Sequence, residues 1–341
     1  MRKALATLAA LALLGGCSAN AVVLEPTPAP ASPRAALSDK HFTERVAPAI
    51  FEQLTKADAA ASPEEFSGRG SGPFSVERSA HYALKRILAD SYDMPELSTT
   101  IDSVAISGAE GFPRSALAVV KWPANTTSQG LNVFTQGAAR ENWALWAAMD
   151  ILPGSVIPEI PAGPAGAQRV AADNGEGAVA SPQAAHDGYL GTLNAKGSAL
   201  SYGSDADPAA ADAVRTQLSQ TYDSLAGAVQ GVGAVSQAFG PAQTTPESFR
   251  ASDGGILTVF QVNQALEIRH TAQGGSIKVT DAKIAGLATG QANTEVTVQG
   301  TMRLNYSFTV ALKIPAAGAQ NTTITTVAAS KPVLTSVQNG G

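Results

Sequence analysis

Residues 97–107 read LSTTIDSVAIS, and the stretches at 115–122, 130–136 and 142–149 repeat the same alternation of apolar and polar side chains. Alternation with a period of two predicts β-strands. Turn sequences separate the stretches, of which Gly111-Phe112-Pro113 is the clearest, and no helical pattern lies between them. Because parallel strands need a long crossover connection, we expect these four strands to form an antiparallel meander.

Two helical patterns precede this meander. Apolar residues recur every three or four positions from 39 to about 60, which predicts a helix with Ser38 or Asp39 as its N-cap. Pro48 lies inside this pattern and is expected to kink or interrupt the helix. A second amphipathic pattern covers residues 75–90.

The second half of the chain repeats this order. Helices are expected at 181–193 and from Asp207-Pro208 to about Gly231. Further strands are expected at 245–252, 256–262, 265–271, 276–285, 294–300, 302–313 and 322–335. The predicted fold class is therefore α+β, with two tandem domains that each place helices before an antiparallel sheet.

The expected boundaries follow from these patterns. They give a first α+β domain at 39–160, a linker at 161–180, a second α+β domain at 181–335 and a tail at 336–341. Helices before a curved meander are the order of NTF2-like and cystatin-like domains, although fold by itself does not fix function. A half-barrel that cradles lipid is the alternative for the second domain.

The N-terminal seventeen residues predict the location of the protein. Arg2 and Lys3 precede an apolar run of signal-peptide length, and the run ends in Leu14-Gly15-Gly16-Cys17. This ending resembles the lipobox of bacterial lipoproteins. The resemblance implies cleavage of residues 1–16 between Gly16 and Cys17, and attachment of lipid to the Cys17 thiol. The alternative is an ordinary secretory signal whose cysteine happens to lie near the cleavage site.

Composition limits the partners. Residues 17–38 are rich in Pro, Ala and Ser and are expected to form a solvated tether. Removal of Arg2 and Lys3 lowers the basic count from 23 to 21 against 28 acidic residues. An acidic body without long runs of Lys and Arg argues against nucleic acid as a partner. Anionic lipid attracts basic segments, so an acidic body is not expected to bind the membrane by its charge. The expected contact with membrane lipid is therefore the acylated Cys17.

The sequence does not indicate catalytic or metal chemistry. None of the four histidines has a second histidine at the spacing of a metal site; they are His41, His81, His186 and His270. We expect His41 and His81 to have surface or capping roles and His270 to be a half-buried strand residue. There is no Gly-x-Ser-x-Gly motif. We therefore expect no catalytic residues, no metal, no cofactor and no enzymatic activity.

Two tryptophans give the one candidate contact in the body of the protein. Trp143 and Trp146 lie three apart in an expected strand, so their side chains should point to opposite faces of the sheet. One is expected in the core, and the other is expected to be exposed beside Arg140 or packed against the second domain. An exposed tryptophan next to an arginine would suit a protein or glycan partner.

Several short motifs resemble those of a family of uncharacterised lipoproteins from high-GC Gram-positive bacteria. Those motifs are Gly72-Pro73 before the helix that carries Arg78, Gly111-Phe112-Pro113-Arg114, Thr135–Arg140 (TQGAAR), Leu152-Pro153-Gly154 with Pro158, and Ser252-Asp253-Gly254-Gly255. The resemblance spans about residues 40–262, and Phe112 stands where the family pattern has Trp. It implies a lipobox, a Pro-rich tether and a body of unknown function.

These observations predict a membrane-anchored, extracytoplasmic lipoprotein that acts as a non-enzymatic binding or assembly module of the cell envelope. Its expected partners are membrane lipid through Cys17 and an envelope protein or lipid ligand. One alternative is a carrier that holds an apolar ligand in a cavity of a bent sheet. A second alternative is an envelope hydrolase, which would need a nucleophile and a base close together in a pocket.

Overall fold

The structure is a computed structural model, and it describes residues 33–122, 125–204, 207 and 212–340. Pro33–Gly341 forms one compact unit. The helices are α1 (Asp39–His41), η1 (Phe42–Val46), α2 (Ala47–Ala60), η2 (Pro63–Phe66), α3 (Gly72–Leu88), η3 (Ala89–Ser91), α4 (Pro182–Leu193), α5 (Ala213–Ala228) and α6 (Ala282–Thr289). The strands are β1 (Thr100–Ile106), β2 (Arg114–Trp122), β3 (Asn125–Gln136), β4 (Ala144–Ile151), β5 (Tyr202–Ser204), β6 (Gly233–Pro241), β7 (Glu247–Arg250), β8 (Ile256–His270), β9 (Ile277–Val279), β10 (Val296–Val298), β11 (Thr301–Ile314), β12 (Ile324–Ala329) and β13 (Val333–Gly340).

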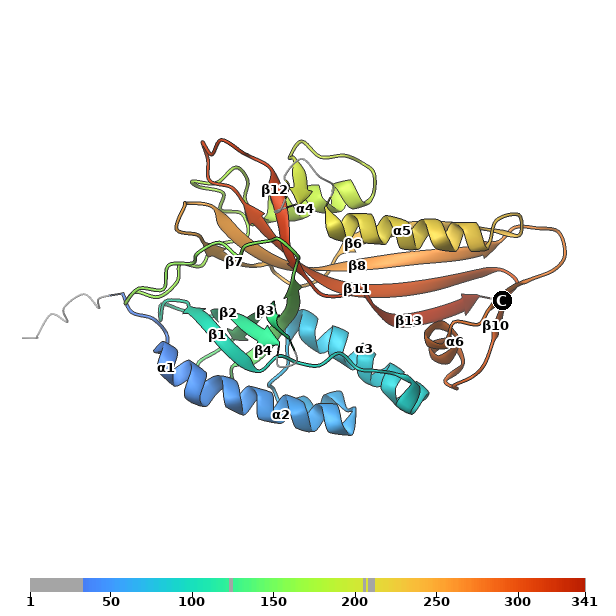
Figure 1. The fold of residues 1–341 in the computed structure, drawn as a ribbon, viewed down its shortest axis with the longest axis horizontal. Coiled ribbons are helices and arrows are strands. Elements are labelled where there is room, and N and C mark those ends of the chain that lie inside the picture. Colours follow the sequence, from blue (N-terminus) through green and yellow to red (C-terminus); the bar gives the residue numbers. More distant parts are fainter. Residues whose placement is uncertain (1–32, 123–124, 205–206, 208–211, 341) are drawn as a thin grey trace, which may run out of the picture. The chain divides into compact units, whose positions relative to one another are not determined.

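Eleven of these strands form one sheet in the order β1-β2-β3-β4-β12-β11-β8-β6, and β13, β5 and β7 pair with β11, β12 and β8 (Figure 1). All pairings are antiparallel except that of β5 with β12. β9 and β10 make a separate two-stranded sheet. The α+β class and the meander β1-β2-β3-β4 are as predicted.

The expected division into two tandem domains is not seen. Ile151 of β4 pairs with Ala328 of β12, so strands of both expected domains belong to one sheet. The expected linker also pairs with both halves. The amide of Ala167 donates to the carbonyl of Ile106 over 2.7 Å, and the amide of Val170 donates to the carbonyl of Ser248 over 2.9 Å. An alternating sequence predicts that a strand forms, but it does not predict which strand lies beside it. Here β12, from the second half, pairs with the edge of β4 that the meander leaves open.

Four of the predicted strands differ from the structure. The stretches 256–262 and 265–271 form the single strand β8. Within 276–285 only β9 is extended, and α6 begins after Asp281, whose carboxylate accepts from the amides of Lys283 and Ile284. The stretch 322–335 is divided between β12 and β13, and β13 continues to Gly340, so the expected tail is largely strand.

The helices follow their predicted caps with one change. Ser38 accepts a hydrogen bond from the amide of His41, as expected of an N-cap. The π-helical turn η1 lies just before Pro48, so the interruption expected from the proline falls on the preceding turn. The long helix of the second half begins at Ala213 and not at Asp207-Pro208, because the carboxylate of Asp212 accepts from the amide of Arg215. Pro208 lies outside the described residues.

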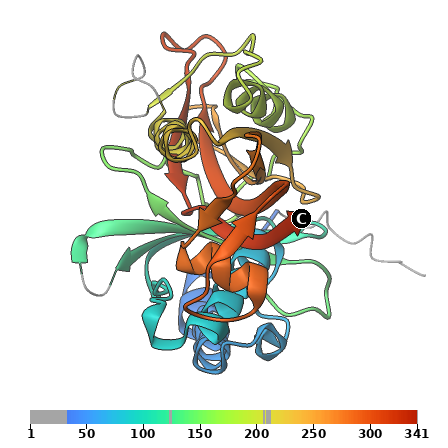
Figure 2. The same ribbon diagram turned by 90° about the vertical axis from the view of Figure 1, so that its right-hand side faces the viewer.

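Both faces of the sheet are covered, and the core extends through both halves. Figures 1 and 2 show α1, α2 and α3 on one side and α4 and α5 on the other. Phe42 and Phe51 contact Phe134 of β3 at ring-centroid distances of 5.2 and 6.0 Å. Where the halves meet, a shared cluster includes Leu131 of β3 and Leu257 of β8. The interior of the bent sheet is thus filled by the protein's own side chains.

Candidate functional site

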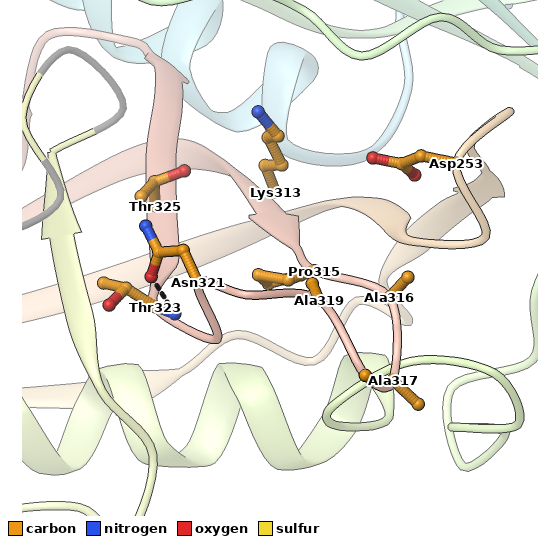
Figure 3. A pocket seen from close by; sticks show the side chains of 10 residues that line it. Asp253, Lys313, Pro315, Ala316, Ala317, Ala319, Asn321, Thr323 and Thr325 are labelled. Atoms are coloured by element: carbon orange, nitrogen blue, oxygen red, sulfur yellow. Dashed lines mark hydrogen bonds between the residues drawn. The ribbon is translucent and has the colours of Figure 1, made fainter.

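A hollow of about 480 Å³ lies where β11 ends and the loop to β12 begins (Figure 3). Its polar side chains come from two parts of the chain that are distant in the sequence, the turn before β8 and the hairpin of β11 and β12. The lining residues are Asp253, Lys313, Pro315, Ala316, Ala317, Gly318, Ala319, Asn321, Thr323 and Thr325. Figure 3 shows Asp253 on one side, Asn321, Thr323 and Thr325 on the other, and Lys313 between them.

The turn between β7 and β8 forms the wall that carries Asp253. Gly254 has a φ of +86°, which is the left-handed conformation that glycine adopts without strain. The amide of Gly255 donates to Oδ1 of Asp253 over 2.8 Å, which fixes the carboxylate in the turn. A β-carbon on Gly255 would lie 2.6 Å from the carbonyl oxygen of Ile314. Only glycine therefore allows this turn to pack against the end of β11.

The opposite wall presents amide and hydroxyl groups. Oδ1 of Asn321 accepts from the amide of Thr323 over 2.9 Å. Lys313 and Thr325 are neighbours in the register of β11 and β12, and Thr325 is buried. A carboxylate only accepts and an ammonium only donates, whereas hydroxyl and amide groups do both. The hollow therefore suits a small hydrophilic ligand that has both donor and acceptor groups.

A second hollow of about 490 Å³ lies on β6, β8 and β11. Its lining residues are Ala238, Phe239, Gly240, Asn263, Gln264, Ala265, Asn305, Tyr306 and Thr335. Asn305 already donates through Nδ2 to the hydroxyl of Ser336 over 2.9 Å, and Gln264 donates to Oε1 of Gln237 over 3.0 Å. The first hollow brings side chains of opposite charge together, Asp253 and Lys313, whereas the second has no charged residue in its lining, so we regard the first hollow as the stronger candidate site.

The structure overturns the exposed-tryptophan prediction. Trp143 and Trp146 do face different sides of the sheet, because they belong to separate core clusters. Both are buried, however, with exposed fractions of 6% and 7%. The indole of Trp146 packs so closely on Gly72 that a β-carbon there would clash with it. Arg140 is exposed in the turn between β3 and β4, without an exposed tryptophan beside it. Trp146 shares its core cluster with Phe249 and Leu257 of the second half, so the packed alternative describes it and the exposed alternative is wrong.

The histidines do not converge on either hollow. His41 is exposed at the first helix, as predicted, and His270 is half-buried in β8, also as predicted. His81 is not a surface residue: its Nδ1 lies 2.6 Å from the hydroxyl of Tyr92, and burial lowers its pKa to about 4. His186 is buried against Phe260, with ring centroids 4.4 Å apart, and burial lowers its pKa. Among the described residues no group of three or more His, Cys, Asp or Glu side chains could hold a metal ion.

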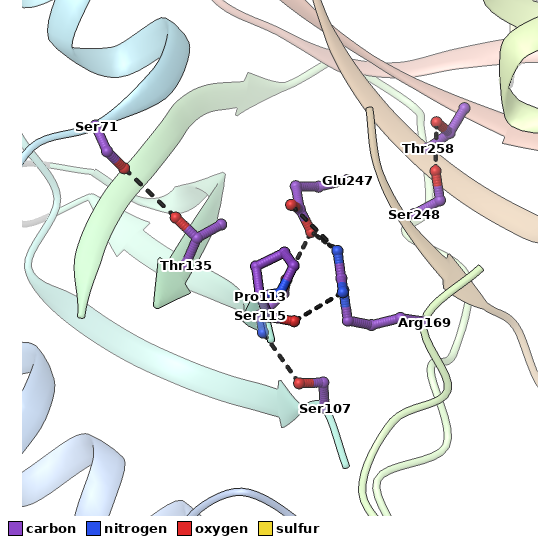
Figure 4. A network of polar contacts seen from close by, with 9 residues as sticks. All are labelled: Ser71, Ser107, Pro113, Ser115, Thr135, Arg169, Glu247, Ser248 and Thr258. Carbon is purple, nitrogen blue, oxygen red and sulfur yellow. Dashed lines mark hydrogen bonds and ion pairs between the residues drawn. The ribbon is translucent and has the colours of Figure 1, made fainter. Parts of the chain in front are cut away.

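Buried polar groups that the sequence did not reveal join the two halves (Figure 4). The hydroxyl of Ser115 donates to the Glu247 carboxylate over 2.6 Å, and Arg169 donates to the same oxygen over 3.2 Å. Arg169 also donates to the carbonyl of Pro113 over 2.7 Å. Burial raises the pKa of Glu247, against the opposite effect of the Arg169 charge. This network holds β2, the segment around Arg169 and β7 together, and we assign it a structural role.

Glu77 is the most perturbed carboxylate of this kind. It lies on α3, 8% exposed, and accepts from the hydroxyl of Thr309 on β11 over 2.6 Å. Burial raises its pKa to about 7, although hydrogen bonds from Thr309 and Ser330 lower it in part. The contacts of Glu77 with Thr309 and Ser330 show that this helix residue faces the sheet. Both partners are distant from Glu77 in the sequence.

Cys17 and Gly16, the expected sites of lipid attachment and cleavage, lie outside the described residues. Within the described part of the chain, no helix is both long enough and apolar enough to cross a membrane.

Comparison with known proteins gives one match. No curated protein and no solved structure matched the chain. A family model matches residues 89–330, which is more than half of the chain and overlaps most of the segment that carries the short motifs. The matched region runs from η3 to the end of β12 and includes both halves of the sheet and the candidate hollow. The chain therefore belongs to the family described as "Domain of unknown function (DUF8094)".

Proposed function

We propose that this protein is a lipoprotein of the cell envelope, anchored by Cys17 to the outer face of the cytoplasmic membrane and acting as a non-enzymatic binding module. The observation that carries the anchor is the sequence Leu14-Gly15-Gly16-Cys17 directly after an apolar run of signal length. Removal of residues 1–16 would leave Cys17 at the N-terminus. The resemblance to lipoproteins of high-GC Gram-positive bacteria supports the same location.

The ligand site in this proposal is the hollow formed by Asp253, Lys313, Asn321 and the two threonines beside them. Its volume of about 480 Å³ falls in the range of small-ligand sites. Its lining includes groups that only donate hydrogen bonds, groups that only accept them and groups that do both. This lining favours a hydrophilic ligand over an apolar one. The proposal does not depend on an NTF2-like or cystatin-like cone, because the hollow lies at the end of strands and not inside a cone.

Fractionation of cells tests the anchor. Wild-type protein is expected in the membrane fraction, with a mass that shows lipid on Cys17. The Cys17→Ser protein is expected in the soluble fraction or as uncleaved precursor. Membrane retention of a processed Cys17→Ser protein would contradict the lipid anchor, because the substituted residue cannot carry thioether-linked lipid.

Ligand capture tests the binding role. Purified protein without the lipid is incubated with a hydrophilic extract of the envelope, and bound small molecules are identified by mass spectrometry. We expect the Asp253→Asn and Asn321→Ala proteins to lose the captured compound. The matched control is Asp223→Asn, an exposed carboxylate on α5 that does not line the hollow. Equal capture by all four proteins would show that the hollow is not the site.

The apolar-carrier alternative has less support. A carrier needs a cavity lined by Val, Ile and Leu, whereas neither hollow contains any of these residues. The hydrolase alternative needs a base in a pocket with a nucleophile, and neither hollow is lined by a histidine. Extraction of the purified protein with organic solvent tests the first alternative directly, since a carrier would release stoichiometric lipid in addition to any chain attached to Cys17.

A further inference from the structure

The first described residues of the chain lie beside the turn that joins β1 to β2. Ala35 pairs with Gly108 in an isolated antiparallel bridge. The amide of Ala109 donates to the carbonyl of Arg34 over 2.7 Å, and the amide of Ala35 donates to that of Pro164 over 2.8 Å. The point at which the chain enters the folded body from the expected anchor is therefore fixed at this turn.

The same turn exposes an aromatic ring with a cation stacked on it. Phe112 is 39% exposed, and it is among the few large apolar side chains on the surface of the described residues. The guanidinium carbon of Arg114 lies 4.3 Å from the centre of the Phe112 ring. Nη2 of Arg114 donates to the carbonyl of Ala109 over 3.3 Å, which holds the guanidinium over the turn.

The charge of this surface is weakly positive. Arg34 and Glu110 are exposed on the two segments that the Ala35–Gly108 bridge joins, and Arg114 is half-buried. Two cations against one anion give only a small attraction to an anionic surface, since each Lys or Arg contributes about 1 kcal/mol there. The turn alone would not bind a membrane stably, but it could contact one to which the chain is already attached.

We propose that the turn of residues 108–114 is a membrane-contact surface, with the Phe112 ring at the headgroup level and Arg34 and Arg114 on lipid phosphates. This inference rests on the proposed anchor at Cys17. Apolar side chains such as Phe insert at the boundary of headgroups and acyl chains, and guanidinium groups bind phosphate in a fork geometry. From residue 17 to residue 33 the chain can extend at most about 55 Å, so the anchor would hold Pro33, beside this turn, within that distance of the lipid.

The experiment uses a chemical anchor so that it does not depend on acylation in the cell. Cys17 is the only cysteine, so the mature chain can be coupled through its thiol to a maleimide lipid in vesicles of phosphatidylglycerol and phosphatidylcholine. The probe is Phe112→Trp, and the matched control is Val232→Trp. Val232 is 41% exposed before β6, and β6 and β1 are the opposite edges of the sheet. Quenching by brominated phosphatidylcholine reports contact with lipid.

We expect brominated lipid to quench the added fluorescence of the Phe112→Trp protein at least twofold more than that of the Val232→Trp protein. Adding Arg34→Gln and Arg114→Gln to the probe protein should reduce this quenching, as should high salt. Equal quenching of both probes, or none, would overturn the proposal and would leave the turn as a candidate contact for an envelope protein. Failure of the anchor itself would show separately, as wild-type-like fractionation of the Cys17→Ser protein in cells.

Discussion

The buried carboxylate of Glu77 predicts a specific pH dependence of stability. Its pKa is raised from 4.5 to about 7 in the folded protein, because burial disfavours the charged form. A group with a raised folded pKa binds more protons in the folded state than in the unfolded state. Its stabilising contribution is therefore complete below pH 4.5 and is lost as the pH rises through 7.

The size of the effect follows from the two pKa values. Each pKa unit corresponds to about 1.4 kcal/mol, so the loss between pH 5 and pH 8 is about 2.5 kcal/mol. The Glu77→Gln substitution removes the titrating group and keeps an oxygen that can accept the hydrogen bond from Thr309. We expect the variant to gain stability relative to wild type by about this amount between pH 5 and pH 8.

Urea unfolding at pH 5, 6, 7 and 8, followed by tryptophan fluorescence, measures this difference. Other groups also have shifted pKa values: burial raises the pKa of Asp212, and it lowers that of His81 to about 4. Both proteins share these groups, so their contributions cancel in the difference of the unfolding free energies. Glu44→Gln, at an exposed carboxylate, is the matched control and should show no such trend. A difference between wild type and Glu77→Gln that is constant with pH would refute the reasoning.

Two further substitutions test the packing. Gly72→Ala should lower the free energy of unfolding by about 1–3 kcal/mol, because the added methyl overlaps the Trp146 indole and the φ of +51° is unfavourable for alanine. Urea unfolding measures this change. An unchanged free energy of unfolding would contradict the close contact. Asn194→Ala should cost about 1–3 kcal/mol and promote self-association, because Asn194 bonds both the amide and the carbonyl of Phe239 on the outer edge of β6. Gel filtration over a range of concentrations should show the association, and a monomeric variant would mean that other groups protect this edge.

Local patterns explain which elements the sequence could predict. The meander and the helices before it follow from apolar spacing and from caps such as Ser38. The residues around β9 alternate as in a strand, but Asp281 caps a helix within that stretch, so the alternation was misleading. β6 escaped prediction because its sequence GAVSQAFGP is rich in small residues and has only one β-branched side chain.

The candidate site was harder to predict from the sequence than the fold. Nothing in the spacing of the sequence shows that Lys313 and Asn321 lie beside Asp253. Their meeting depends on the pairing of β11 with β8 and β12, which is a long-range property. The same is true of the tryptophans, whose alternation was correctly predicted but whose burial depends on helices in the case of Trp143 and on strands of the second half in the case of Trp146.

The family match and the packing divide the chain at different places. The match begins at residue 89, whereas α1, α2 and α3 lie before it. These helices are nevertheless part of the same core, since Phe42 contacts Phe134 and Trp143, and Glu77 contacts Thr309. Without them, this apolar face of β3 and β4 would be open to solvent. In this chain the matched region is therefore not a self-sufficient domain, and the helices before it close the sheet that carries the candidate site.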